Sequence, residues 1–309
     1  MKPPLGGFFH ALKSSPMLAN LAALGAALCW AAGGLIAVAP VRAIGSVAFN
    51  RIRMVIVFTM LSLAATLTGG WATLDLQAVA WLALSGAVGI FLGDTALFWA
   101  LSRLGPRRNV VIYATNAPLT ALLGWLLLGE ALAPLTLLGI GLVTVGVMLA
   151  VALRGGTHDL ESVRGPLLAG VGVCLIAALC QAGGSILAKP ALAAGADPAA
   201  GAAVRVGMSG LLLWLGALLP GERAGVFEGL TPRIVAMIAA NGFIGLGLGM
   251  TLLMIGLKLG DAGVAATLSA TSPVLILPML WALTRQPPRP GAWIGAAVAV
   301  AGVMLIVNR

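Results

Sequence analysis

The residues of this sequence best suited to chemistry are four ionisable side chains inside long apolar runs: Arg51, Arg53, Asp94 and Arg205. A charged side chain at the centre of a bilayer costs roughly 2.5–3.5 kcal/mol on insertion scales, so such residues are candidates for function. Counted from the ends of their runs at about 1.5 Å per residue, Asp94 and the first two arginines lie at similar depth. We therefore predict that Asp94 pairs with Arg51 or Arg53.

Asp94 is the one acid deep inside an apolar run, which makes it the candidate for carrying a proton or for gating with Arg51 or Arg53. The alternative is a structural ion pair, or arginines that extend to the lipid headgroups. In the second half of the chain, Arg205 stands where Arg51 does, and Gly249 stands opposite Asp94. Arg205 therefore lacks an obvious acidic partner, and we expect it to meet an anionic group on a substrate or to extend to headgroups.

Residues this deep in apolar sequence must be held by membrane-spanning helices. Of the 309 residues, 60% are hydrophobic and 9% are charged, whereas a soluble domain has about 25% charged residues. Crossing the hydrocarbon core takes about 20 apolar residues as a helix, and runs of this length exclude barrel strands. The sequence predicts ten spans: 17–38, 47–67, 76–101, 109–128, 134–153, 165–187, 199–219, 232–257, 262–283 and 290–307.

The two halves of the sequence resemble each other, with glycines, prolines and a GVML segment matching in the same order. We assign residues 17–153 to a first repeat of five spans and residues 165–307 to a second. Because five is an odd number, the second repeat must enter the membrane inverted. Inverted repeats are typical of secondary transporters, which bind substrates near the membrane midplane where the repeats meet. The matching pairs include Gly33-Gly34 with Gly183-Gly184, Pro118 with Pro273, and Gly146 with Gly302.

Pro118 and Pro273 lie inside apolar runs, where a proline frees backbone carbonyls and permits a kink. Because they recur at one depth, we expect them to mark a shared pivot or the wall of a cavity. Asn116 and Ser272 supply an amide and a hydroxyl at the same level, and we expect them to face a substrate.

Soluble-enzyme and nucleic-acid sites are not apparent in the sequence. Both histidines, His10 and His158, lie outside the apolar runs, and we find no metal-ligand cluster and no Walker A sequence. We therefore expect no metal and no cofactor. The net charge of +9 comes mainly from Lys and Arg between apolar runs, as in juxtamembrane anchors, so we expect no nucleic acid partner. An integral-membrane enzyme and a non-transporting scaffold are the alternatives to a transporter.

Four segments resemble the EamA domain of the drug/metabolite transporter superfamily: ALSRLG at 100–105, PLTALLGWLLLGE at 118–130, PLTLLG at 134–139 and GVML at 146–149. Residues 165–307 look like a more divergent copy, with Arg285 in place of Glu130. The resemblance implies a ten-helix carrier of a bacterial inner membrane that exports amino acids or other small metabolites. It also implies a central cavity among the first, third, fourth, sixth, eighth and ninth spans. The lining residues expected on that basis are Trp30, Asp94, Trp99, Asn116, Gln181 and Asn241.

Two signals disagree on orientation. Loops after odd-numbered spans hold most of the Lys and Arg, so the positive-inside rule places both termini outside. The family resemblance implies cytoplasmic termini instead. In either orientation the expected partners are a small-molecule substrate and the lipid bilayer, and we expect a monomer.

Overall fold

The computed structural model describes residues 16–153, 166–218, 229–285 and 287–308. These residues are overwhelmingly helical, and no strand occurs among them. Ten of the described helical stretches are long and apolar enough to cross a membrane. For this part of the chain, the predicted all-α fold with ten membrane-spanning helices is confirmed.

The first repeat begins with two long helices and then contains two composite spans. A short 3-10 turn, η1 (Gly70–Thr73), joins the second span to the third. The five spans are α2 (Pro16–Ile44), α3 (Ser46–Leu67), α4–η2–α5 (Leu76–Ser85, Gly86–Leu92, Gly93–Leu104), α6–α7 (Pro106–Tyr113, Asn116–Leu128) and α8 (Pro134–Ala152).

The five spans of the second repeat are built in the same order from single and composite helices. Its five spans are α9 (Leu167–Ala193), α10 (Pro198–Gly216), α11–η4–α12 (Pro232–Asn241, Gly242–Leu248, Gly249–Leu259), α13–α14 (Ala262–Ser269, Ser272–Thr284) and α15 (Pro290–Val307). Composite spans therefore recur at the third and fourth places of both repeats.

The predicted ends of the first and sixth spans are wrong. The sequence predicts ends at residues 38 and 187, but α2 continues to Ile44 and α9 continues to Ala193. Pro40 and Pro190 lie inside these extensions. A proline disfavours a helix interior in water, but in a membrane protein neighbouring helices can satisfy the backbone groups that it frees. The helices therefore run on through the prolines.

The third and eighth spans each contain a π-helical segment of seven residues in their middle, η2 and η4. Such segments are rare and occur frequently at functional sites. The helices that follow them begin at Gly93 and at Gly249. This register places Met250, not Gly249, opposite Asp94, which corrects the predicted match by one residue. Neither residue is acidic, so Asp94 still has no acidic counterpart in the second repeat.

The fourth and ninth spans are each broken into two helices, at Thr115 and at Thr271. In both breaks the threonine hydroxyl donates a hydrogen bond of 2.7 Å to the carbonyl three residues earlier. Pro118 and Pro273 lie in the first turn after the break, where the backbone N–H has no helical partner in any case. The two prolines therefore start the second helix of each span instead of kinking a continuous one. Pro118 is the third residue of α7 and Pro273 the second of α14, so the predicted match of the two prolines is off by one residue.

The second helices of these broken spans, α7 and α14, have 13 residues each and end in the left-handed conformation. The residue in that conformation is Gly129 in one repeat and Arg285 in the other. Arg285 is therefore the structural counterpart of Gly129. The predicted match of Arg285 with Glu130 is off by one residue.

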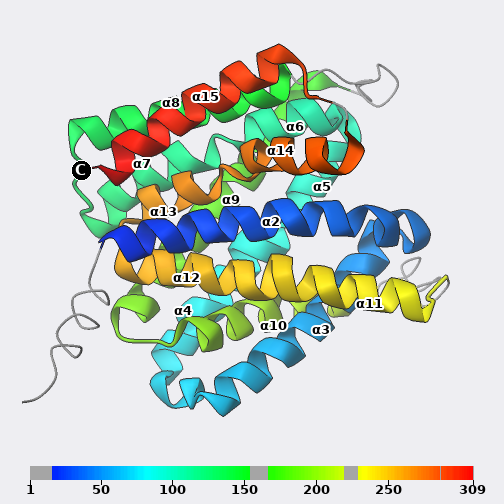
Figure 1. The fold of residues 1–309 in the computed structure, drawn as a ribbon. Coiled ribbons are helices and arrows are strands. Elements are labelled where there is room, and N and C mark those ends of the chain that lie inside the picture. Colours follow the sequence, from blue (N-terminus) through cyan, green and yellow to red (C-terminus); the bar gives the residue numbers. More distant parts are fainter. Residues whose placement is uncertain (1–15, 154–165, 219–228, 286, 309) are drawn as a thin grey trace, which may run out of the picture.

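The two repeats are interleaved, and equivalent helices of each repeat make equivalent contacts with the other repeat. The first span, α2, packs against η4 and α12 of the second repeat, while α9 packs against η2 and α5 of the first. Figure 1 shows α2 running beside α12, and α8 running beside α15 along one edge of the bundle. Because α3 packs on α10 in the same reciprocal manner, the packing agrees with a pseudo-two-fold relation between the repeats.

Glycine pairs allow the repeats to cross at van der Waals distance. A Cβ at Gly33 would lie 2.9 Å from the Cα of Gly245, and a Cβ at Gly89 would lie 2.9 Å from the Cα of Gly184. The residue before each π-helical segment secures the crossing. In the second repeat, Asn241 Nδ2 donates to the Gly33 carbonyl at 2.7 Å. In the first repeat, the hydroxyl of Ser85 donates to the Gly184 carbonyl at 2.5 Å. We call these two places the glycine crossings.

The surface of the bundle suits lipid, and its interior suits close packing. Large apolar side chains such as Leu127, Leu168, Leu283 and Ile294 are exposed, whereas most of the buried apolar residues are alanines. Small interior residues let helix backbones approach closely. Helices associate in this way in a bilayer, where the hydrophobic effect does not drive them together.

Candidate functional site

A cavity of about 100 Å³ lies where helices of both repeats meet. We call it the central cavity. Four of the predicted binding residues, Trp30, Asn116, Gln181 and Ser272, line it. Among the described residues of its wall there is no Asp, Glu, Lys, Arg or His. The other lining residues are Val110, Tyr113, Ala114, Val147, Ser185, Leu253, Ala266, Ser269, Ala270 and Pro273.

The breaks in the spans position the polar groups of the central cavity. Asn116 begins α7, and its Nδ2 donates to the Tyr113 carbonyl across the break at 2.7 Å. This bond leaves the amide oxygen and the second N–H of Asn116 available to a ligand. Trp30 packs beside Gly249, where a Cβ would lie 2.8 Å from the indole Nε1, so the glycine makes room for the ring. The wall can thus offer hydrogen bonds and aromatic contact to a small polar molecule.

Asp94 and Trp99 line a different cavity from the one that the family resemblance implies. This second cavity, of about 370 Å³, lies between α3, the third span and α10 and also contains Arg51 in its wall. We call it the Asp94 cavity. Asp94 interacts electrostatically with Arg53 and also with Tyr113, which lines the central cavity. Asp94 therefore shares the wall of the Asp94 cavity with Arg51 and lies within electrostatic range of Arg53 and of Tyr113 in the wall of the central cavity.

The two arginines beside Asp94 are held by different contacts. Arg51 is 4% exposed, and its Nε donates to the Leu213 carbonyl on α10 at 3.2 Å. Arg53 Nη2 donates to Asn50 Oδ1 at 2.5 Å, and its guanidinium lies 5.3 Å from the centre of the Phe49 ring. Arg51 thus connects the two repeats, whereas Arg53 is held within α3. An ion pair of Asp94 with one of them stays a prediction.

Arg205 and Asn241 lie outside the walls of both cavities. Arg205 is completely buried, and its Nη1 donates to the Sδ of Met254 at 3.4 Å. The Nε and Nη2 of Arg205 have no hydrogen-bond partner among the described residues. Asn241 donates through Nδ2 to the glycine crossing described above, while its Oδ1 is buried without a hydrogen-bond partner among the described residues. Pro118 lines a further cavity of about 470 Å³ beside Trp125, while Pro273 lines the central one.

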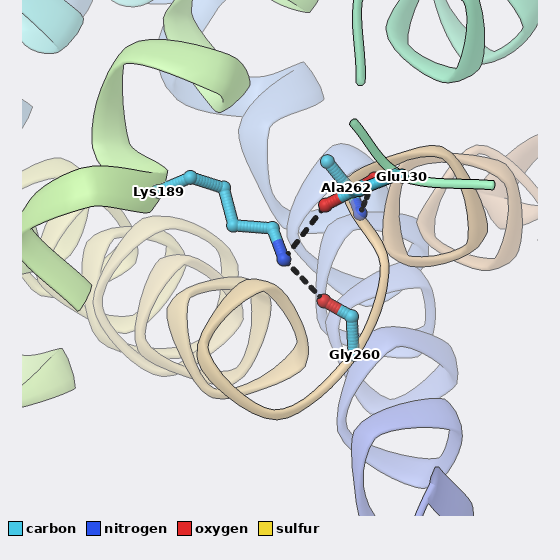
Figure 2. Close-up of polar contacts among 4 residues, drawn as sticks. All are labelled: Glu130, Lys189, Gly260 and Ala262. Carbon is cyan, nitrogen blue, oxygen red and sulfur yellow. Dashed lines mark hydrogen bonds and ion pairs between the residues drawn. The ribbon is translucent and has the colours of Figure 1, made fainter. Parts of the chain in front are cut away.

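Figure 2 shows a polar cluster that sequence reasoning did not find. The Nζ of Lys189 on α9 lies 2.9 Å from Oε1 of Glu130 and donates to the Gly260 carbonyl at 2.6 Å. The other carboxylate oxygen, Oε2 of Glu130, accepts the N–H of Ala262 at 2.8 Å and so caps the start of α13. We call these four residues the Glu130–Lys189 latch. It joins the end of the fourth span, in the first repeat, to the end of the sixth span and to the connection between the eighth and ninth spans, in the second repeat.

All members of the latch lie on one side of the membrane. Glu130 follows the fourth span, Lys189 lies near the end of the sixth, and Gly260 and Ala262 connect the eighth to the ninth. By the count of spans these ends share the side of the N-terminus, the left of Figure 1, where α2 begins and α12 ends. This parity is the one signal in the sequence that points to the latch. Arg51 begins the second span and therefore lies toward the opposite side.

The profile of the EamA-like transporter family matches residues 17–152 and again residues 168–308. The two matches together cover nearly all of the chain. The chain belongs to the EamA-like transporter family. It is therefore a multi-pass membrane protein of the drug/metabolite transporter type with a two-repeat architecture, which implies a small-molecule substrate.

Other comparisons of this EamA-like transporter are less specific. A solved structure titled "Crystal structure of protein" aligns with a TM-score of 0.75 and 18% sequence identity, covering 95% of this chain and 98% of that chain. At this identity the likeness shows the shared fold alone. No curated protein matches the sequence.

Proposed function

We propose that this EamA-like transporter is a secondary carrier that moves an amino acid or a related small metabolite by alternating access through the central cavity. The observation that carries the proposal is the place and chemistry of this cavity. It lies between the repeats, and its wall combines amide and hydroxyl groups with aromatic and apolar surface. Substrate sites of inverted-repeat carriers lie at the corresponding place, near the midplane between repeats.

The latch supports the alternating-access part of the proposal. It ties Glu130 of the first repeat to α9 and α13 of the second on the N-terminal side. We propose that the latch keeps the carrier closed on that side. Its release would then let the repeats part there, while the glycine crossings between η2 and α9 and between η4 and α2 serve as pivots.

The proposal also covers the energy source and the direction of transport. We propose that the carrier resides in a bacterial inner membrane, exports its substrate and couples this movement to protons at Asp94, with Arg51 and Arg53 as gating partners. Support comes from the position of Asp94, which interacts electrostatically both with Arg53 and with Tyr113 in the wall of the central cavity. A charge change at Asp94 would therefore be felt at both places. Each chain encloses its own cavity, so we expect a monomer to be active.

The test is solute counterflow in proteoliposomes that contain the purified protein. Wild-type protein should exchange labelled amino acids faster than empty liposomes, and Gln181→Ala should raise the half-saturating concentration about tenfold by removing one ligand hydrogen bond. Gln77→Ala is the matched control, because Gln77 is an exposed amide at the start of α4. Equal kinetics of the Gln181 and Gln77 variants would contradict the role of the central cavity.

A further inference from the structure

A buried cation with no charged partner among the described residues, Arg205, lies near the central cavity. Arg205 is 0% exposed in the middle of α10, and two of its three guanidinium nitrogens have no partner among the described residues. The third nitrogen donates to the sulfur of Met254, which is a weak acceptor. Arginine cannot lose its proton under ordinary conditions, so the guanidinium stays charged.

The arginines of the first repeat have stronger partners. Arg51 has a carbonyl acceptor at 3.2 Å, and Arg53 has an amide oxygen at 2.5 Å with Asp94 close by. Arg205 has neither kind of contact with any residue that the structure describes. An unpaired charge in an apolar interior is strongly unfavourable, and an apolar side chain of similar volume is often at least as stable at such a place. Packing alone therefore does not account for an arginine here.

The surroundings of Arg205 show how a ligand in the cavity can reach it. A Cβ at Gly89 would lie 3.3 Å from the Arg205 Nη2, so the guanidinium lies against the η2 segment beside this glycine. Gly89 packs on Gly184, and the next residue, Ser185, lines the central cavity. On the other side, Leu253 also lines the cavity and directly precedes the methionine that Arg205 contacts. Rotation of η2 against α9 about this glycine crossing would therefore expose the guanidinium to the cavity.

We infer that Arg205 is the anion receptor of the transport site and that the substrate carries a carboxylate. The described wall of the central cavity holds no cationic side chain of its own, so Arg205 behind it is the nearby partner for an anionic substrate group. The planar guanidinium can bind the two carboxylate oxygens at once with its free N–H groups. This inference rests on the proposed function and names the substrate class of its site. It also assigns Arg205 to a state in which η2 has rotated about this crossing.

The experiment compares carboxylates with carboxamides, in which an uncharged amide group replaces the carboxylate. Counterflow in proteoliposomes is measured for glycine, L-alanine, L-threonine and L-leucine, and for the four corresponding carboxamides. A hydrogen-bonded charge is worth about 1.5–3 kcal/mol, so the wild type should prefer the acids about 10- to 100-fold. Arg205→Met should abolish the preference, and Arg205→Lys should retain part of it. Arg42→Met is the matched control, because Arg42 is exposed in the last turn of α2.

Each outcome decides one of the two claims. Equal flux of acids and amides in the wild type, or an unchanged preference in Arg205→Met, overturns the inference while transport itself stands. If the wild type moves none of these compounds, that substrate proposal fails, and the inference is then decided by thermal unfolding of the purified protein. Sodium acetate should raise the unfolding midpoint of the wild type above the effect of acetamide and sodium chloride, and this gain should vanish in Arg205→Met. No acetate-specific rise overturns the inference. If Arg205→Met is not monodisperse, Arg205→Gln replaces it in both assays.

Discussion

Replacing Glu130 with glutamine should release the latch and shift the carrier away from the conformation described here. The change removes the ion pair with Lys189 at 2.9 Å and weakens the hydrogen bond from the Ala262 N–H at 2.8 Å. The two side chains are largely buried, at 10% exposure for Glu130 and 17% for Lys189. Removing one partner of a buried pair costs about 3–5 kcal/mol, and the retained bond to Gly260 favours the lower end, about 3 kcal/mol. That corresponds to a population shift of roughly a hundredfold.

The assay is a distance measurement between spin labels on the two sides of the latch. Labels at Ala131 and Ala194 are suitable, because both positions are exposed and flank Glu130 and α9. The labels are attached in a background in which the three native cysteines are replaced, and the protein is studied in lipid nanodiscs. The wild type should give one short distance, and Glu130→Gln should add a longer one as the repeats part.

Lys189→Met should act like Glu130→Gln, because it breaks the same pair from the other side. Lys258→Met is the matched control. Lys258 lies on the same membrane side but donates to the carbonyls of Gly195 and Ala196, all within the second repeat. It should leave the distance unchanged. If both latch variants give the wild-type distance distribution, the latch does not hold this conformation.

Three further predictions follow from the packing and from Asp94. Gly89→Ala should lower the free energy of unfolding by about 1–3 kcal/mol and slow counterflow, because its Cβ would lie 2.9 Å from the Cα of Gly184. An unaffected counterflow rate would argue against the crossing as a pivot. Gly146→Ala should destabilise the folded protein without a specific effect on substrate affinity, because its Cβ would lie 2.3 Å from the Ala299 nitrogen on α15. A thermal melt measures the stability, and a saturation curve measures the affinity. Asp94→Asn should abolish proton-driven accumulation and leave counterflow intact, and accumulation driven by a proton gradient alone in this variant would exclude Asp94 as the coupling site.

Much of the fold is predictable from the sequence because span length and repetition are local or collinear patterns. The apolar runs locate all ten spans, and the matched glycines and prolines indicate the repeat. The extent of the first and sixth spans was missed because Pro40 and Pro190 normally signal a helix end, whereas here the helices continue through them. The π-helical segments were also missed, because a helix that widens by one residue keeps the same apolar composition.

The site was harder to predict than the fold, because apolar helices show no periodicity that tells which face is inside. Asn116 and Ser272 were found since they lie at the breaks of the fourth and ninth spans, which the prolines mark. Asp94 and Trp99 belong to spans that the resemblance places around the central cavity, but their side chains line the neighbouring one. The latch depends on contacts between ends of distant spans, and only three-dimensional packing brings those together.

The most direct test of the central claim is to block the central cavity chemically during transport. Ser272→Cys in a background without the native cysteines places one thiol in the cavity wall, and Leu122→Cys places one on the exposed surface of α7. After reaction with a bulky methanethiosulfonate reagent, counterflow should stop in the Ser272 variant and continue in the Leu122 variant, and excess substrate should slow the labelling of Cys at position 272. Undiminished counterflow through fully labelled Ser272→Cys protein would contradict the account, because the substrate would then cross the membrane by another route.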